Sequence, residues 1–239
     1  MNADAGRPTF LLVHGGWHGA WCWDAVRAAL DADGWRSHAL DLPSANPPAD
    51  RPDGARPVGM LDDADVIRDS LRRIDGPVVV VAHSYGGVPT TEAIADAANV
   101  VAAVYLASFQ LDAGESVFTF LGKAAPDGGT DLAPPSEAAR RILFDDVPEA
   151  DAARAVARLR PQSIRSFTEK VTTAGWRTVR SSYVVCDRDQ ALDPSRQREL
   201  ATRAASVHRL PSSHSPFLSM PRQLAALLAR IATSDLPAA

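Results

Sequence analysis

The sequence predicts an α/β fold: a doubly wound, mostly parallel sheet with an inserted helical lid. Three observations lead to this prediction. Short apolar runs alternate with segments of helical periodicity along most of the 239 residues, as in folds built from βαβ units. Four consecutive valines at residues 78–81 lack polar alternation, which is typical of a strand covered on both faces. Between residues 110 and 180 the alternation stops, and helical stretches separated by glycine and proline follow one another.

The elements can be assigned in chain order from these patterns. Apolar runs rich in β-formers predict strands, and apolar spacing of three and four residues predicts helices. The expected strands cover residues 9–13, 35–40, 78–82, 100–106, 182–186 and 206–210. The expected helices cover residues 20–32, 61–74, 88–98, 195–203 and 221–231, with 136–144, 149–159 and 164–172 in the middle segment. A proline-rich loop is expected at residues 43–57. We therefore expect a core of residues 1–109 and 181–239 and a lid of residues 110–180.

Composition and charge argue against several function classes. The net charge of -4 and the pI near 5.8, without a basic stripe, disfavour nucleic acid and acidic membrane surfaces as partners. No apolar run is long enough to cross a bilayer, and the first eight residues lack the pattern of a secretory signal. Cys22 and Cys186 lie in apolar surroundings and are expected to be reduced and buried. These features favour a cytoplasmic protein, and the low lysine and isoleucine content favours a bacterial one.

Ser84 has the sequence context of an activated nucleophile. It directly follows the valine-rich strand and precedes Gly86, Gly87 and a helix, which is the strand–turn–helix arrangement of a nucleophile elbow. Such a sharp turn needs small residues two positions before and after the serine, and here these are Ala82 and Gly86. The alternative interpretation is a helix N-cap serine beside a glycine turn. The buried strand ahead of the serine favours the nucleophile.

A serine hydroxyl needs a general base, and the position of His214 fits that role. In folds with this elbow, the base comes late in the chain, after the last strand. His214 lies between the strand at 206–210 and the closing helix. His208 lies inside the strand, His83 adjoins the serine but should point away from its hydroxyl, and His38 is expected to be an ordinary, partly buried residue.

The acid that orients this histidine should follow the preceding strand, where the sequence offers three aspartates. Such a carboxylate holds the imidazole in the useful tautomer and stabilises the imidazolium. Asp189 is the first choice, three residues past the strand end and 25 before His214. Asp187 is the second choice. Asp193 precedes Pro194 and is better suited to capping the next helix.

Backbone donors for a developing oxyanion are expected at two places. One is the N–H of Tyr85, which follows the nucleophile at the start of a helix. The other should come from the glycine turn after the first strand, where Gly16 is the first choice and Trp17 the second. The alternative for this turn is a tight connection without a catalytic role.

With these residues placed, the sequence resembles one family of α/β hydrolases: the plant methyl-ester hydrolases and hydroxynitrile lyases with their bacterial esterase relatives. The matching stretches are residues 14–23, 41–43, 82–87, 183–197 and 213–214, within a span of about 9–231. The resemblance implies an α/β-hydrolase fold and a triad of Ser84, His214 and Asp189 that needs no metal and no cofactor. It supports Asp189 because the family's acid lies eight residues before a glutamine, here Gln197.

The same resemblance implies Gly16 and Tyr85 as oxyanion donors and a structural role for His18. It implies a small-molecule ester as the partner, and it leaves room for a homodimer. Two departures distinguish this chain from the lyases, which have a threonine at the position of Gly15 and a lysine at that of Ser215. Because that lysine stabilises the leaving cyanide, its absence favours hydrolysis of carboxylic esters. A weakly catalytic ligand-binding protein, a lyase and an acyltransferase are the alternatives.

Overall fold

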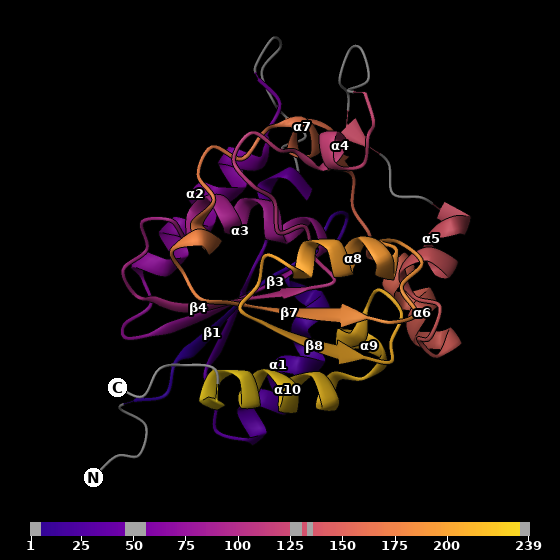
Figure 1. Ribbon diagram of the computed structural model, residues 1–239. Coiled ribbons are helices and arrows are strands. Elements are labelled where there is room, and N and C mark those ends of the chain that lie inside the picture. Colours follow the sequence, from indigo (N-terminus) through magenta and orange to yellow (C-terminus); the bar gives the residue numbers. More distant parts are fainter. Residues whose placement is uncertain (1–5, 46–55, 125–130, 133–135, 235–239) are drawn as a thin grey trace.

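The computed structural model describes residues 6–45, 56–124, 131–132 and 136–234. Most of the loop expected at 43–57 lies outside these residues, and the rest of the expected order of strands and helices can be compared directly. The two ends of the described chain lie on the same side of the molecule (Figure 1).

A six-stranded parallel sheet forms the centre of the molecule. Its strands are β1 (Thr9–Val13), β2 (Ser37–Leu40), β3 (Val78–His83), β4 (Val100–Leu106), β7 (Ser181–Cys186) and β8 (Ser206–Leu210), in the spatial order β2-β1-β3-β4-β7-β8. Every residue of β1, β3 and β7 is buried, whereas buried and accessible positions mix along the edge strands β2 and β8. This difference explains why the central strands appear in the sequence as unbroken apolar runs.

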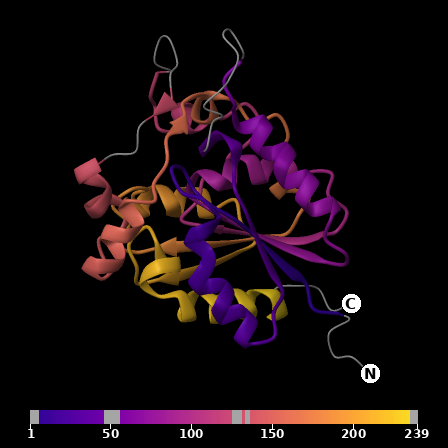
Figure 2. The same cartoon turned by 180° about the vertical axis from the view of Figure 1, so that it is seen from behind.

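Helices cover both faces of the sheet, which confirms the doubly wound arrangement. The helices are α1 (Asp24–Ala32) and α10 (Pro221–Ser234) on one face, and α2 (Met60–Arg72), α3 (Gly87–Ala93) and α8 (Pro194–Ala201) on the other. Figure 2 shows α1 and α10, in indigo and yellow, together below the sheet. Alternate side chains of each central strand enter the two cores: Phe10 and Leu12 pack towards α1 and α10, Leu11 and Val13 towards α2 and α3.

The segment between β4 and β7 holds the inserted elements. These are α4 (Val117–Phe120), β5 (Asp131–Leu132), α5 (Ser136–Leu143), α6 (Glu149–Val156), β6 (Gln162–Ser163) and α7 (Arg165–Thr168). The helices α5 and α6 share a small apolar core of their own, and in Figure 1 they lie beyond the arrowheads of β7 and β8. The carboxyl ends of the parallel strands, where loops meet, therefore face this segment.

Three expected helices end three or more residues early. The helix expected at 149–159 ends with α6 at Val156. The helix expected at 88–98 ends with α3 at Ala93, where Gly175 packs directly against Ile94. The helix expected at 164–172 ends with α7 at Thr168. After α7, tertiary contacts provide the hydrogen-bond partners that a longer helix would have supplied.

The end of α7 shows this exchange of partners most clearly. The backbone N–H groups of Thr172 and Thr173 donate to the carboxylate of Glu92, 2.7 and 3.1 Å away, instead of to helix carbonyls. A further short helix, α9 (Pro216–Ser219), follows the loop that contains His214 (the base loop) and was not expected.

Two features bear on cellular context. Cys22 and Cys186 are free and buried, as expected, and burial raises the pKa of both thiols. Within the described ranges, no helix is long and apolar enough to cross a membrane.

Candidate active site

Ser84 lies at the carboxyl end of β3, in a left-handed backbone conformation with φ of +51°. This conformation is unusual for a residue with a side chain and is typical of a strained functional turn. A 3-10 turn, Ser84–Gly86, leads directly into α3. A Cβ on Gly86 would collide with the carbonyl oxygen of His14, which explains the need for glycine two residues after Ser84. The carbonyl oxygen of Ser84 accepts from the Ser108 hydroxyl at 2.7 Å, so the turn is also held by the loop after β4.

The expected acid, Asp189, and the expected base, His214, are hydrogen-bonded to each other. The ring Nδ1 of His214 lies 2.7 Å from Oδ2 of Asp189, and both side chains are buried. Gln197 donates to the same carboxylate oxygen at 2.8 Å. The backbone N–H groups of Ala191 and Leu192 donate to Oδ1 at 2.7 and 2.9 Å. With every partner a donor, the carboxylate is held as an acceptor for Nδ1 of His214.

The other two candidate acids have different partners. Asp187 forms an ion pair with Arg209 at the protein surface. Asp193 accepts from the backbone N–H of Ser195 at 2.7 Å and caps α8, with Pro194 at its first position. Neither carboxylate is among the groups that contact His214.

Three further histidines lie next to the site as buried neutral groups. His83 donates from Nε2 to the carbonyl oxygen of His214 at 2.9 Å, which fixes the backbone of the base loop. His18 donates from Nδ1 to the carbonyl oxygen of Gly16 at 2.8 Å. Burial lowers the pKa of His14 to about 4 and that of His18 to about 3, and it lowers the pKa of His83 well below its usual value. Their surroundings therefore favour a structural role over proton transfer.

The two expected oxyanion segments border the same cavity as Ser84 and His214. Gly16 and Tyr85 both line it. The backbone N–H of Trp17 donates to Oε1 of Gln162 at 3.1 Å, so this second-choice donor already has a partner. Trp17 itself has a φ of +62°. The glycine turn is therefore held in an unusual conformation by a contact from the inserted segment.

This cavity has a volume of about 450 Å³ and a mostly apolar lining. Much of that lining comes from the segment between β4 and β7, namely Val117, Phe118, Leu121, Ile142, Leu143 and Phe167. The same segment also supports the base loop, because Asp146 accepts from the backbone N–H of Ser213 at 2.8 Å. The apolar lining therefore lies between Ser84 and the inserted helices.

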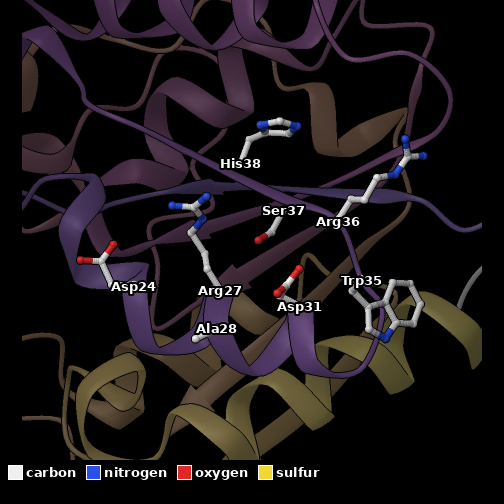
Figure 3. A pocket seen from close by; sticks show the side chains of 8 residues that line it. All are labelled: Asp24, Arg27, Ala28, Asp31, Trp35, Arg36, Ser37 and His38. Atoms are coloured by element: carbon white, nitrogen blue, oxygen red, sulfur yellow. The ribbon is translucent and has the colours of Figure 1, made fainter.

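A separate surface pocket lies beside the start of the edge strand β2 (Figure 3). It is lined by α1 and the start of β2, with Asp24, Arg27, Asp31 and Arg36 among its side chains. His38 is exposed there, which corrects its expected partial burial. None of the residues placed at the elbow contributes to this pocket. Among the described residues, no group of three or more histidine, cysteine and acidic side chains could hold a metal ion.

Sequence reasoning missed a buried polar network beside the elbow. Asp63, Ser44 and Gln162 are fully buried and hydrogen-bonded to one another in series. Burial raises the pKa of Asp63 to about 7, against the lowering effect of its hydrogen bonds with Ser44 and Tyr85. The one signal in the sequence is that Asp63 occupies the apolar stripe of α2, with Met60, Ile67 and Leu71.

Comparison with known proteins identifies the family of this chain. The profile of the Alpha/beta hydrolase family matches residues 10–227. "Probable hydrolase R7" of Phoma sp. is 28% identical over 95% of this chain and 98% of its own length. "Methyl jasmonate esterase 1" of Vitis vinifera is 28% identical over 94% and 97%.

Solved structures show the same relationship. The Arabidopsis methylesterase MES16 is 26% identical, with a TM-score of 0.80 over 95% of this chain and 99% of that one. A pyrethroid hydrolase from Sphingobium faniae JZ-2 shares the fold, with 24% identity and a TM-score of 0.79 over 95% and 98%. With the profile covering nearly all of the sheet and the relatives matching over almost their whole length, this chain belongs to the alpha/beta hydrolase family.

Proposed function

We propose that this chain is a carboxylesterase that cleaves esters of small apolar compounds through an acyl-enzyme on Ser84. The observation that carries the proposal is that His214, whose ring is hydrogen-bonded to the buried Asp189, borders the same apolar cavity as the strained Ser84. Relatives named as esterases and hydrolases support ester hydrolysis as the activity. The buried free cysteines support a reducing compartment such as the cytoplasm.

The first half of the reaction follows from the proposed roles. His214 accepts the proton of the Ser84 hydroxyl through Nε2 as the oxygen attacks the ester carbonyl. Asp189 stabilises the imidazolium that forms, through the contact to Nδ1. The carbonyl oxygen becomes an oxyanion, to which the backbone N–H groups of Gly16 and Tyr85 donate. The imidazolium then gives its proton to the departing alcohol, leaving the acyl group on Ser84.

Water completes the cycle. His214 removes a proton from a water molecule that attacks the acyl-enzyme. When the second tetrahedral intermediate collapses, the imidazolium returns this proton to the departing Ser84 oxygen, which releases the acid and restores the free hydroxyl. We propose that the inserted residues 110–180 act as a lid, because they supply much of the apolar lining over the nucleophile. Gly15 supports hydrolysis over cyanohydrin cleavage: a Cβ there would lie 2.7 Å from Nδ1 of His83 and 2.8 Å from Cβ of Ser84.

The test is turnover of short p-nitrophenyl esters by the wild-type protein, Ser84→Ala and a matched control. Ser84→Ala should lower kcat by at least about 10⁴-fold, because no acyl-enzyme can form. Ser70→Ala is the control: this serine donates to the Val66 carbonyl oxygen on α2, outside the cavity, and activity should stay at the wild-type level. Mass spectrometry with an organophosphonate should find one adduct, on Ser84. Equal turnover by wild type and Ser84→Ala would refute the mechanism, and absence of both turnover and adduct would favour a binding protein.

A further inference from the structure

Asp63 is a buried carboxylate that the proposed chemistry does not use. It accepts from the backbone N–H of Ser44 at 2.9 Å, from the Ser44 hydroxyl at 2.5 Å and from the Tyr85 hydroxyl at 2.5 Å. Its neighbour Asp62 already performs the local task of an acid in the first turn of α2, since it accepts from the Gly59 N–H at 2.7 Å. Burying a carboxylate costs free energy unless its partners compensate, so capping of α2 does not account for Asp63.

The network has two arms, or chains of contacts, that start at Asp63. The first arm reaches Tyr85, the residue after the proposed nucleophile. The Tyr85 hydroxyl donates to Oδ2 of Asp63, while the ring of Tyr85 packs edge-on against Phe167 with the centroids 5.2 Å apart. Burial raises the pKa of Tyr85 well above its ordinary value, so its hydroxyl stays protonated and remains a donor. This contact holds the far end of the side chain whose own backbone N–H is one proposed oxyanion donor.

The second arm reaches the glycine turn. Gln162 accepts from the Trp17 N–H through Oε1 and donates through Nε2 to the hydroxyls of Ser44 and Ser166, each at 2.7 Å. The Trp17 carbonyl oxygen accepts from the Arg160 N–H at 2.9 Å, so both sides of this residue are held by the inserted segment. Trp17 directly follows Gly16, and its positive φ needs such support.

The hydrogen bonds of the network have a single consistent direction. Because the Trp17 N–H can only donate, Oε1 of Gln162 must face it, and the amide NH₂ must face Ser44. The Ser44 hydroxyl accepts from that amide and therefore gives its own proton to Asp63. Both arms end on the carboxylate, which in its ionised form accepts from all its partners. A neutral amide at this position would place a donor against two hydroxyl donors.

Building on the proposed function, we propose that Asp63 is a positioning residue for the oxyanion hole, acting through Ser44 and Gln162 on Gly16 and directly on Tyr85. The two backbone segments come from different loops of the sheet, after β1 and after β3. The network joins them at one acceptor and also ties them to the inserted segment. The segment's position over the cavity and the geometry of the oxyanion donors are thereby linked.

The experiment separates ground-state binding from oxyanion stabilisation in Asp63→Asn. We expect kcat for p-nitrophenyl esters to fall roughly 10- to 100-fold with KM within about threefold, since loss of one whole oxyanion donor costs about 10²–10³. An aryl trifluoromethyl ketone, which forms an oxyanion on Ser84, should bind about 10- to 100-fold more weakly. The related aryl carbinol, which forms no oxyanion, should bind to Asp63→Asn with the same affinity as to the wild type. Equal weakening of both compounds, or an unchanged kcat, would overturn the proposal.

A matched pair of tyrosines covers the case in which Asp63→Asn does not fold. Tyr85→Phe and Tyr105→Phe each remove one buried hydroxyl. The Tyr85 hydroxyl bonds with Asp63, whereas the Tyr105 hydroxyl bonds with Thr91 at 2.8 Å. Tyr85→Phe should lower kcat and ketone affinity about 3- to 10-fold, while Tyr105→Phe should change only thermal stability. Identical kcat for the two variants would contradict the positioning role. A wild-type protein without turnover or ketone adduct would instead refute the proposed function itself.

Discussion

Asp189 and Asp63 are both buried carboxylates surrounded by hydrogen-bond donors, yet they meet different partners. Asp189 accepts from two backbone N–H groups, from Gln197 and from the ring of His214. Asp63 accepts from one backbone N–H and two hydroxyls. The imidazole can take up a positive charge during a reaction, whereas the hydroxyls cannot. The same functional group therefore suits charge stabilisation at one place and fixed geometry at the other.

The position of each carboxylate in the fold matches this difference. Asp189 lies in the loop after β7, at the carboxyl edge of the sheet where the chemistry of parallel α/β folds gathers. Asp63 lies one layer out, on α2, and contacts the elbow through the Tyr85 hydroxyl, far from the backbone of that turn. The four experiments that follow test this contrast.

The largest effect is expected from Asp189→Asn. The amide can hold His214 only in the wrong tautomer and cannot stabilise the imidazolium, so kcat should fall about 10⁴-fold while KM changes little. Steady-state kinetics with p-nitrophenyl esters measures both. A loss no larger than that of Asp63→Asn would remove the distinction between the two carboxylates.

The second-largest effect is expected from Asp63, in the pH dependence of the free energy of unfolding. Its folded-state pKa of about 7 lies above the ordinary value of 3.8, so its stabilising contribution is fully present below pH 3.8 and is lost as the pH rises through 7. The stability advantage of the wild type over Asp63→Asn should therefore shrink by up to roughly 4 kcal/mol between pH 4 and 8. Urea unfolding at several pH values measures it. A constant difference would refute the raised pKa.

His14 should change the stability with pH in the opposite direction. Its folded-state pKa of about 4 lies below the ordinary 6.5, so the protein loses stability as the pH falls from 6.5 towards 4, by up to roughly 3 kcal/mol. The advantage of the wild type over His14→Gln should shrink with acidification, whereas that over Asp63→Asn should grow. The same unfolding series compares the two slopes. Slopes of equal sign would show that burial does not govern both groups.

The smallest effect is expected from Asp187→Asn. This aspartate lies two residues from Asp189 but pairs with Arg209 at the surface, where ion pairs contribute little. Its kcat should stay within about twofold of wild type, as measured in the same assay. A large loss would instead favour the second-choice acid of the sequence analysis.

The sequence was sufficient for the parts of the site that depend on local order along the chain. Strand, turn and helix around Ser84 follow from a valine run and two glycines, and the loops after β7 and β8 follow from the direction of parallel strands. His214 and the three candidate aspartates could be located because each needs only its own strand to be identified, and the resemblance through Gln197 favoured Asp189. The structure brings Asp189 and His214 together at 2.7 Å.

Asp63 and Gln162 could not be found in this way, because their partners are far along the chain. Gln162 bonds with Ser44, 118 residues away, and Trp17 bonds with Gln162, 145 residues away. The same holds for α7, whose expected last turn is replaced by contacts with Glu92. Such long-range hydrogen bonds leave no periodic pattern in the sequence.

The two buried thiols have a practical consequence for following the inserted segment in solution. Cys22 and Cys186 are the only cysteines of the chain, and burial keeps both protonated and shielded from alkylating reagents. A cysteine introduced at Arg141, which is exposed on α5, would then be the one site that a maleimide dye modifies quickly. The native chain thus has no fast-reacting thiol that would compete with this label in fluorescence measurements on the inserted segment.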